Sequence, residues 1–414
     1  MGFVQIVGYG LAILVMLGIL SMIIIVHECG HYLVARLFGF QTPVFGFGLP
    51  FAGPYWVLGR RWGTEFRFHA LLLGGYVAIP ELGDESALEE DLGVPLKPLR
   101  KFPIWQRICV ASAGVSFNAL SAFVIMVIMF FTLGQPVQPT VVHALIKSNP
   151  IAASAGVRAG DQIYAIAGQK VLSPDDAVHI LTSHKAQAIN LQLMRAGSPV
   201  TITVTTNKQG KVGMALISKG RAKWEKVEGS FTHVVGLATV RLCTLTSNML
   251  EALGQLFSGI FSGGAGEKGA PSLGIQDLHG IFAVIKIGAD IAQQDWTQLF
   301  LFTIMISMDI AIINIMPFPV LDGWHVICFV LEALRGKPLP AKPNAEIMKW
   351  GVVALLTLMA LVTVNDVTAW LQGKLNVKID KDDKVRSATP AAPERSTTPA
   401  GSIKLAPSTT GNQH

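Results

Sequence analysis

The stretch IIIVHECGHYLVAR, residues 23–36, places three ionisable side chains within an apolar run. Such side chains are costly in an apolar setting, so His27, Glu28 and His31 require a partner that offsets the cost. Two histidines four residues apart on a helix face the same side and can bind one metal ion. The carboxylate beside them can act as a general base. The stretch therefore predicts a zinc site on His27 and His31, with Glu28 as the base.

A third zinc ligand has to come from a distant part of the chain. Catalytic zinc ions usually have three protein ligands and one open position. Some zinc proteases carry a further histidine six residues after the second one, but here that position is Leu37. The extended form of the motif is therefore excluded.

The best source of that ligand is NIMPFPVLDGWH, residues 314–325. Two prolines break a helix there and free backbone groups, which at membrane depth are tolerated only beside protein or a water-filled cavity. Asp322 is the first candidate. Asp309, about three turns earlier, and His325 remain alternatives. Two histidines and one aspartate suit zinc best, although iron or cobalt can also be accommodated.

The composition is that of a membrane protein. Of the 414 residues, 51% are hydrophobic and only 14% are charged, whereas soluble domains carry about 25% charged residues. The net charge of +6 is modest and does not indicate nucleic-acid binding. The four cysteines show no CxxC spacing, so we expect buried thiols and neither a disulfide framework nor a zinc knuckle.

Four stretches are candidates for membrane-spanning helices, which need about 20 predominantly apolar residues. Three are clearly apolar and the fourth contains Asp309 and Asn314; they are residues 3–26, 108–133, 347–370 and 297–320. The first stretch lacks the basic start and the cleavage site of a signal peptide, so we expect it to be retained.

Lysine and arginine residues predict the orientation, because cytoplasmic loops carry an excess of them. Eight lie in residues 36–107 and four in the short segment 335–349. We expect both segments in the cytoplasm, beside the lipid bilayer. The N-terminus, residues 134–295 and the C-terminus then face the other side.

The remaining segments differ in character. Residues 66–80, FRFHALLLGGYVAIP, alternate and then turn at a Gly-Gly pair, which predicts a β-hairpin. Residues 138–217 are polar and strand-like, and 230–293 contain an amphipathic pattern suited to a membrane surface. The predicted organisation is an N-terminal membrane part, an inserted domain, a membrane-surface region, a C-terminal membrane part and a disordered tail, at 1–137, 138–217, 218–295, 296–373 and 374–414.

Two motifs at opposite ends of the chain resemble those of a known family. HECGH in the first apolar stretch and N-x-x-P-x-P-x-L-D-G near the C-terminal side resemble the site-2 protease family of intramembrane zinc metalloproteases. The bacterial branch that includes the regulator of sigma-E protease is the most similar. The resemblance extends to GGYV at 74–77, AGVSFN at 113–118 and NDVTAW at 365–370, and so covers most of the chain.

The resemblance implies a zinc metalloendopeptidase that cleaves within the transmembrane segments of single-span membrane proteins, such as anti-sigma factors or remnant signal peptides. It implies that His27, His31 and Asp322 bind zinc and that Glu28 is the base. The implied fold is a multi-pass α-helical membrane protein with about four transmembrane helices, a membrane-associated β-hairpin and an inserted α+β PDZ domain. The implied location is the bacterial inner membrane, with the active site toward the cytoplasm.

The resemblance also implies residues that hold the substrate. The hairpin would pair with an extended substrate segment through Gly74, Gly75, Tyr76 and Val77. Asn314 would contact the substrate backbone near the zinc ion.

The inserted domain resembles a single bacterial PDZ domain. Its core matches GVRAGDQIYAIAGQKV, residues 156–171, with a turn at Gly160-Asp161 and with Ile163 and Ile166 pointing inward. PDZ domains bind peptides by strand addition. This domain, on the extracytoplasmic side, either binds a peptide ligand or excludes bulky substrates.

Two other classes of function compete with a protease. A metal-binding scaffold would need the histidines but not Glu28, so the intact Glu28 favours an enzyme. A transporter could use the histidines with Asp309 and Asp322 as an ion path. Transporters often contain two related halves, and the sequence shows no internal repeat.

Overall fold

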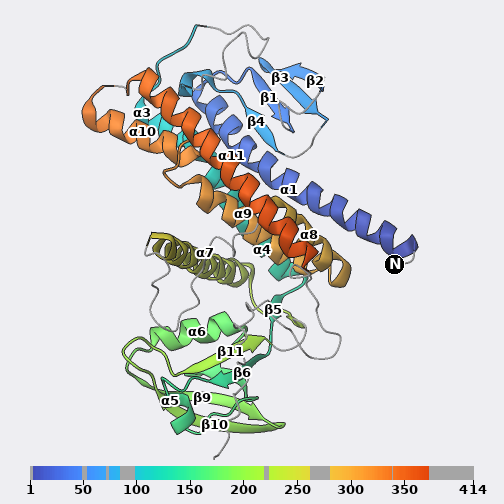
Figure 1. The fold of residues 1–414 in the computed structure, drawn as a ribbon, viewed down its shortest axis with the longest axis vertical. Helices are drawn as coiled ribbons and strands as arrows, with labels where there is room; N and C mark the ends of the chain where they lie inside the picture. Colours follow the sequence, from blue (N-terminus) through green and yellow to red (C-terminus); the bar gives the residue numbers. More distant parts are fainter. Residues whose placement is uncertain are drawn as a thin grey trace, which may run out of the picture.

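The computed structural model describes residues 3–48, 54–70, 74–83, 98–218, 223–261, 280–337 and 339–372. Figure 1 shows three parts: a small β-sheet beside one end of α1, a bundle of helices in the middle, and an α+β unit at the opposite end. The tail 374–414, which we predicted to be disordered, lies outside the described residues.

The described helices fall into groups that are separated by strands along the chain. Those described are α1 (Phe3–Phe38), η1 (Pro80–Leu82), α3 (Ile104–Ala111), α4 (Ala113–Thr132), α5 (Ile151–Ser154), α6 (Pro174–Ser183), α7 (Phe231–Phe261), α8 (Ile281–Gln294), α9 (Gln298–Asn314), α10 (Asp322–Arg335) and α11 (Ala341–Leu371).

Three of the described helices are long and apolar enough to cross a membrane, and they overlap three of the four predicted stretches. They are α1, α4 and α11, while α9 is a shorter apolar helix of 17 residues. At about 1.5 Å per residue, the 36 residues of α1 exceed what a hydrocarbon core of about 30 Å requires. The helix therefore continues past the predicted end at residue 26 and carries the HECGH motif.

Small residues allow α1 and α4 to pack closely. A Cβ at Gly30 would lie 2.6 Å from the carbonyl oxygen of Ala113, so only glycine fits there. Small residues are common where membrane helices touch. On its other side α4 packs with α7 and α9 around a core that includes Met126, Met129 and Ile304. The first helix is thus fixed against a well-packed centre.

The small sheet has the strand order β2-β3-β1-β4. Its strands are β1 (Val44–Phe47), β2 (Tyr55–Arg61), β3 (Thr64–His69) and β4 (Gly75–Val77). β1 is parallel to β3 and antiparallel to β4. This order leaves β4 at an edge, next to α1.

The predicted pairing of residues 66–80 as a hairpin is wrong. β3 and β4 do not pair with each other, because β1 lies between them and contributes the buried Val44 and Phe45. The tight hairpin is β2–β3, with positive φ at Trp62 and Gly63, as a type I′ turn requires. The Gly-Gly pair looks like a hairpin turn in the sequence, but it marks the start of an edge strand.

The inserted unit has its own core. Its strands are β6 (Thr140–Leu145), β7 (Gln162–Ile166), β8 (Gln169–Lys170), β9 (Ala188–Arg195), β10 (Ser198–Thr205) and β11 (Met214–Ser218). The sheet order is β10-β9-β7-β6-β11, with β8 on β7, and α6 packs against it. As predicted, Ile163 and Ile166 are buried and Gly160 has a positive φ of 92°.

One buried carboxylate ties this unit together. Asp161 accepts hydrogen bonds from the Arg195 guanidinium and from the backbone amide of Arg158, at 2.7–2.8 Å. These bonds, with the charge of Arg195, hold the pKa of Asp161 below its usual range. A two-stranded ribbon of β5 (Gln135–Val137) and β12 (Lys223–Glu225) brings the two ends of the unit together. The unit is therefore a single insertion between β5 and β12.

The region predicted at the membrane surface contributes two helices to the bundle. α7 packs through Val234 and Ala238 against α4 and α9. α8 packs along α1, where a Cβ at Gly288 would lie 2.4 Å from the sulfur of Met16. Helix α8 therefore belongs to the helix bundle and has buried residues along its length.

The first turn of α8 is capped by another helix. A carboxylate oxygen of Asp366, in α11, accepts hydrogen bonds from the backbone amides of Gly280 and Ala283, at 2.9 and 3.2 Å. The first amides of a helix have no partner within the helix. The carboxylate provides partners for two of them and fastens α11 to α8.

Candidate metal centre

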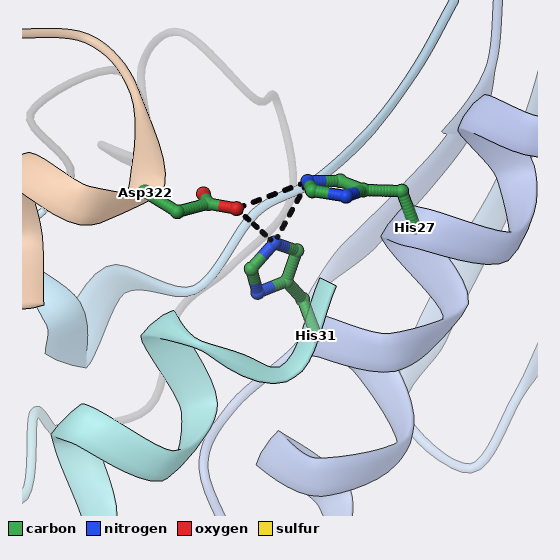
Figure 2. A group of neighbouring side chains, drawn as sticks. All are labelled: His27, His31 and Asp322. Carbon is green, nitrogen blue, oxygen red and sulfur yellow. Dashed lines mark hydrogen bonds and ion pairs between the residues drawn. The ribbon is translucent and has the colours of Figure 1, made fainter. Parts of the chain in front are cut away.

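Three potential metal ligands meet between α1 and α10. The Nε2 atoms of His27 and His31 lie 3.3 Å apart, and Oδ2 of Asp322 lies 3.0 Å from the first and 3.2 Å from the second. Figure 2 shows the three side chains pointing toward one another. Ligands of a tetrahedral zinc ion at about 2.0–2.1 Å are separated by about 3.3 Å. The spacing of these atoms fits one zinc ion.

The protonation of His31 supports a cation at this point. Its Nδ1 lies 2.8 Å from the carbonyl oxygen of Val110, which can only accept a hydrogen bond, so Nδ1 carries the proton. In the neutral ring the Nε2 lone pair then faces the carboxylate of Asp322. Apart from the two imidazoles, this Asp322 oxygen has no partner among the described residues. A neutral imidazole lone pair and a carboxylate that face each other are unfavourable, and a cation between them offsets that cost.

Glu28 lines the same cavity without belonging to the group of ligands. The cavity has a volume of about 150 Å³ and is lined by His27, Glu28, His31, Val77, Ile79, Leu82, Ala111, Asp322 and His325. A buried water molecule needs at least about 10–15 Å³ of such volume. There is therefore room for water next to both the ligands and a carboxylate.

The start of α10 places Asp322 against α1. Val320 has a φ of 89°, which is strained for a β-branched residue. A Cβ at Gly323 would lie 2.2 Å from the carbonyl oxygen of Ile315, so the glycine lets α10 begin directly against the end of α9. These two features explain why an Asp-Gly pair after two prolines aims its carboxylate into the cavity.

A half-buried ion pair holds α10 in place. Arg107 in α3 lies 2.6 Å from the carboxylate of Glu332 and stacks over the ring of Phe329, 4.7 Å from its centroid. Arg combines charge and a flat surface, so it can make both contacts. The pair connects the helix that carries Asp322 to the segment before α4.

The structure distinguishes the three candidates for the third zinc ligand that the sequence left open, which are Asp322, Asp309 and His325. Among the described residues, the His/Cys/Asp/Glu group able to hold a metal ion consists of His27, His31 and Asp322. Asp309 is exposed on α9. His325 lines the cavity but is not part of that group.

The predicted substrate-binding residues lie at different distances from this centre. A Cβ at Gly75 would lie 3.2 Å from Cγ of Glu28, and the backbone of Val77 faces the Glu28 carboxylate in the same cavity. Gly74 is buried, and its carbonyl oxygen accepts from Gly48 at 2.9 Å. Asn314 ends α9, partly buried, and is not among the residues that line the cavity.

Comparison with known proteins identifies this architecture. A family model described as Peptidase family M50 matches residues 15–358. The chain belongs to peptidase family M50. It is 31% identical over 372 residues to "Putative zinc metalloprotease" of Synechocystis sp., which covers 86% of this chain and 94% of the relative. It is 29% identical over 376 residues to "Membrane metalloprotease ARASP, chloroplastic" of Arabidopsis thaliana, covering 86% and 78%.

This M50 peptidase is therefore a zinc metalloendopeptidase of the site-2 protease family and a membrane protein. The predicted family, enzyme class and zinc cofactor are confirmed. The scaffold and transporter hypotheses lose their support, since neither requires an M50 chain with an intact HECGH motif.

No individual role was predicted for Gly114, which lies in the AGVSFN segment of α4. A Cβ there would lie 2.3 Å from Nε2 of His31 and 2.6 Å from Nε2 of His27. The bare backbone of α4 thus forms one wall of the metal centre. The sequence signals were the AGVSFN resemblance and a glycine in an apolar helix, which is costly unless something packs on it.

Substitution of Gly114 by alanine is expected to weaken zinc binding by about 10–100-fold, the range seen when residues around a metal site are disturbed. The methyl group has to displace an imidazole or separate α4 from α1. Zinc content after dialysis against a graded chelator series measures the effect. Gly18→Ala on α1 is the control, since no atom lies within 4 Å of its added Cβ. Equal zinc content in the two variants would show that the wall is not needed.

Proposed function

We propose that this M50 peptidase hydrolyses peptide bonds within the transmembrane segments of single-span membrane proteins. His27, His31 and Asp322 hold the zinc ion, and Glu28 is the general base. The observation that carries the proposal is the convergence of these three ligand atoms beside Glu28 on a helix apolar enough to span a membrane.

The chemistry follows from the positions of the side chains. Zinc, when bound, polarises the carbonyl group of the substrate and lowers the pKa of a water molecule. Glu28 takes a proton from the attacking water and delivers it to the nitrogen of the leaving amine. The backbone amide of Val77 faces this carboxylate, and a hydrogen bond between them would keep Glu28 in one orientation while the proton moves.

The free edge of β4 supports binding of an extended substrate. Gly48 donates to the carbonyl of Gly74, and Ala78 donates to that of Val44. Bonded and non-bonded pairs alternate in an antiparallel ladder, so the backbone groups of Gly75 and Val77 point away from β1. In a helical substrate the backbone carbonyls accept hydrogen bonds from within the helix. An unwound segment could form hydrogen bonds with this edge. The backbone groups of Tyr76 are directed to β1, and Asn314 would be a further contact of the substrate.

Replacing Val77 with proline is expected to reduce cleavage about tenfold while zinc remains bound. Proline removes the one backbone donor of Val77, which can serve either Glu28 or the substrate, and a hydrogen bond to a charged group contributes about 1.5–3 kcal/mol. Pairing with β1 survives, because proline is tolerated where the amide points out of a sheet. Initial cleavage rates and zinc content are measured on the same samples.

Val57→Pro is the matched control for that variant, because Val57 is exposed on the opposite edge strand of the same sheet. If both proline variants cleave at the rate of the unmodified enzyme, β4 has no part in substrate binding.

The inserted unit supports a role in substrate choice. Its edge strand β11 lies beside α6, an arrangement that suits peptide binding by strand addition. As a PDZ domain on the extracytoplasmic side, it would bind a peptide or exclude substrates with bulky outer domains. The basic segments near the site support a cytoplasmic orientation of the metal centre in a bacterial inner membrane.

A reconstituted assay tests the proposed function. The purified enzyme is placed in lipid vesicles with a single-span model substrate tagged at both ends. One substrate has an all-leucine transmembrane segment, and a second has helix-breaking Asn-Gly residues in its middle. We expect cleavage inside the second segment, loss of cleavage with a chelator and recovery with Zn²⁺. Cleavage confined to the parts outside the membrane would contradict intramembrane proteolysis.

A further inference from the structure

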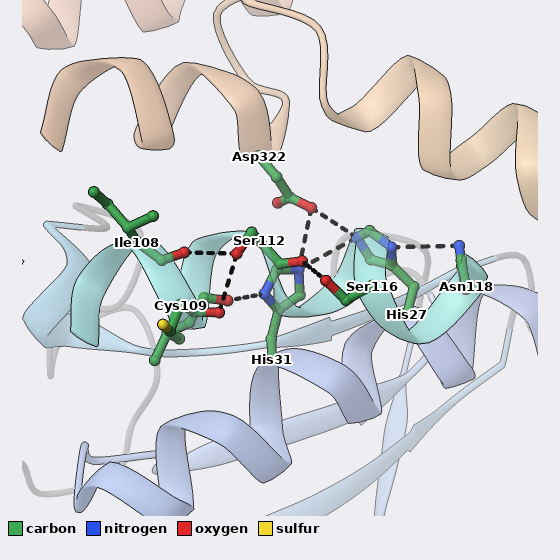
Figure 3. A network of polar contacts seen from close by, with 9 residues as sticks. His27, His31, Ile108, Cys109, Ser112, Ser116, Asn118 and Asp322 are labelled. Atoms are coloured by element: carbon green, nitrogen blue, oxygen red, sulfur yellow. Dashed lines mark hydrogen bonds and ion pairs between the residues drawn. The ribbon is translucent and has the colours of Figure 1, made fainter. Parts of the chain in front are cut away.

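Helix α4 also contacts the metal centre one turn after Gly114. Asn118 is fully buried, and its Nδ2 lies 3.4 Å from Nδ1 of His27. Its other amide atom, Oδ1, is buried without a hydrogen-bond partner. Figure 3 shows the Asn118 side chain on the far side of the His27 ring from Asp322. A buried amide with one half unsatisfied is costly, so its position calls for an explanation.

The tautomer of His27 provides that explanation. When Nε2 of a neutral imidazole binds a metal ion, the proton sits on Nδ1 and needs an acceptor. For His31 that acceptor is the carbonyl oxygen of Val110. For His27 the neighbouring group is the amide of Asn118. Rotation of the amide by 180° exchanges its oxygen and nitrogen with little change of shape, and it places Oδ1 where it can accept the Nδ1 proton, while Nδ2 takes the former position of Oδ1.

The backbone of Asn118 is fixed independently of the metal centre. Its carbonyl oxygen accepts hydrogen bonds from Ser307 on α9 and from Ser121 one turn later, both at 2.9 Å. The two serine hydroxyls lie 3.0 Å apart, so one of them can instead donate to the other while its partner keeps the bond to the carbonyl. The amide therefore projects from a point where α4 and α9 are joined, which limits its movement relative to His27.

We propose that Asn118 is a positioning residue of the zinc site. Its Oδ1 accepts the Nδ1 proton of His27, which fixes the ring orientation and leaves the Nε2 lone pair for zinc. The inference rests on the proposed function through the assignment of His27 as a ligand. It differs from that assignment because Asn118 acts through His27 and does not touch the metal ion.

The test compares two substitutions of similar size in the full-length protein. Asn118→Leu removes the acceptor, and Asn118→Asp keeps an acceptor in its place. We expect Asn118→Leu to bind zinc about 10–100-fold more weakly, the usual cost of losing the partner of a metal-bound histidine. Asn118→Asp should stay within a few-fold of the unmodified protein. Competition with a zinc chelator gives the affinities without any proteolysis.

A spectroscopic readout and a control separate positioning from general stability. Co²⁺ replaces zinc in such sites, and its visible absorption should change in the leucine variant and persist in the aspartate variant. Ser116→Ala is the control, because that hydroxyl bonds only to the backbone of its own helix. Elution as a single species in detergent confirms that each variant is folded.

The zinc affinities of the variants decide whether Asn118 positions His27. Unchanged zinc affinity in Asn118→Leu overturns the proposal. Equal losses in the leucine and aspartate variants also overturn it, because the acceptor would then be irrelevant. If the leucine variant does not fold, weakened zinc binding in Asn118→Asp alone overturns it and retained binding supports it. His27→Ala is measured in parallel, since normal zinc binding there would instead refute the ligand assignment.

Discussion

Replacement of Glu28 by glutamine is expected to lower the rate of peptide hydrolysis by about 10²–10⁴-fold, the usual contribution of a positioned general base. Glutamine has nearly the same shape and can still contact the amide of Val77, but it cannot accept the proton from the attacking water. Zinc should remain bound, because Glu28 is not one of the three grouped ligands. The assay follows a tagged single-span substrate and measures zinc in the same samples.

Glu228→Gln is the matched control, since that glutamate is exposed in the loop before α7. It should cleave at the normal rate. Equal cleavage by the Glu28 and Glu228 variants would mean that another group is the base or that a contaminating protease is present. Loss of zinc from Glu28→Gln would instead make this carboxylate part of the metal-binding site.

Replacement of Asp322 by asparagine is expected to weaken zinc binding by on the order of 100-fold or more. Structural zinc sites bind the ion with apparent free energies of about 10–16 kcal/mol, spread over four ligands. Loss of one anionic ligand therefore removes a large share of that binding free energy. The asparagine keeps the size of the side chain at the start of α10, and the helix should form as before. Zinc affinity by chelator competition and cleavage of the substrate should fall together.

Asp309→Asn is the decisive comparison, because the sequence alone offered Asp309 as a rival ligand. This residue lies exposed on α9, so its variant should retain zinc. The opposite result, with zinc lost from Asp309→Asn and kept in Asp322→Asn, would show that the ligand comes from α9.

The choice of ligands shows where sequence analysis reaches its limit. The spacing of His27 and His31 is a property of one helix and could be predicted from the sequence. The proposed third ligand lies on a separate helix, and spacing favoured no one of Asp309, Asp322 and His325 decisively. The family resemblance selected Asp322, and the structure brings the same residue within 3.2 Å of both imidazoles.

The strand pairing shows the same limit in the sheet. The alternating pattern of 66–80 correctly indicated extended chain, and Gly75 to Val77 form a strand beside the metal centre. The predicted partner of this strand was wrong because pairing between strands is a long-range contact. β1, contributed by residues before the β2–β3 hairpin, takes the place between them.

The sequence by itself determined the membrane class, the long apolar helices, the two histidines with their glutamate, and the inserted unit with its own core. Each of these depends on composition or on the repeat of one helix or strand, which neighbouring residues establish. The tertiary structure alone decided that α4 presents Gly114 and Asn118 to the imidazoles, and that β4 leaves an edge free next to Glu28. These relations join residues far apart in the chain, and they arise only when the helices and strands pack.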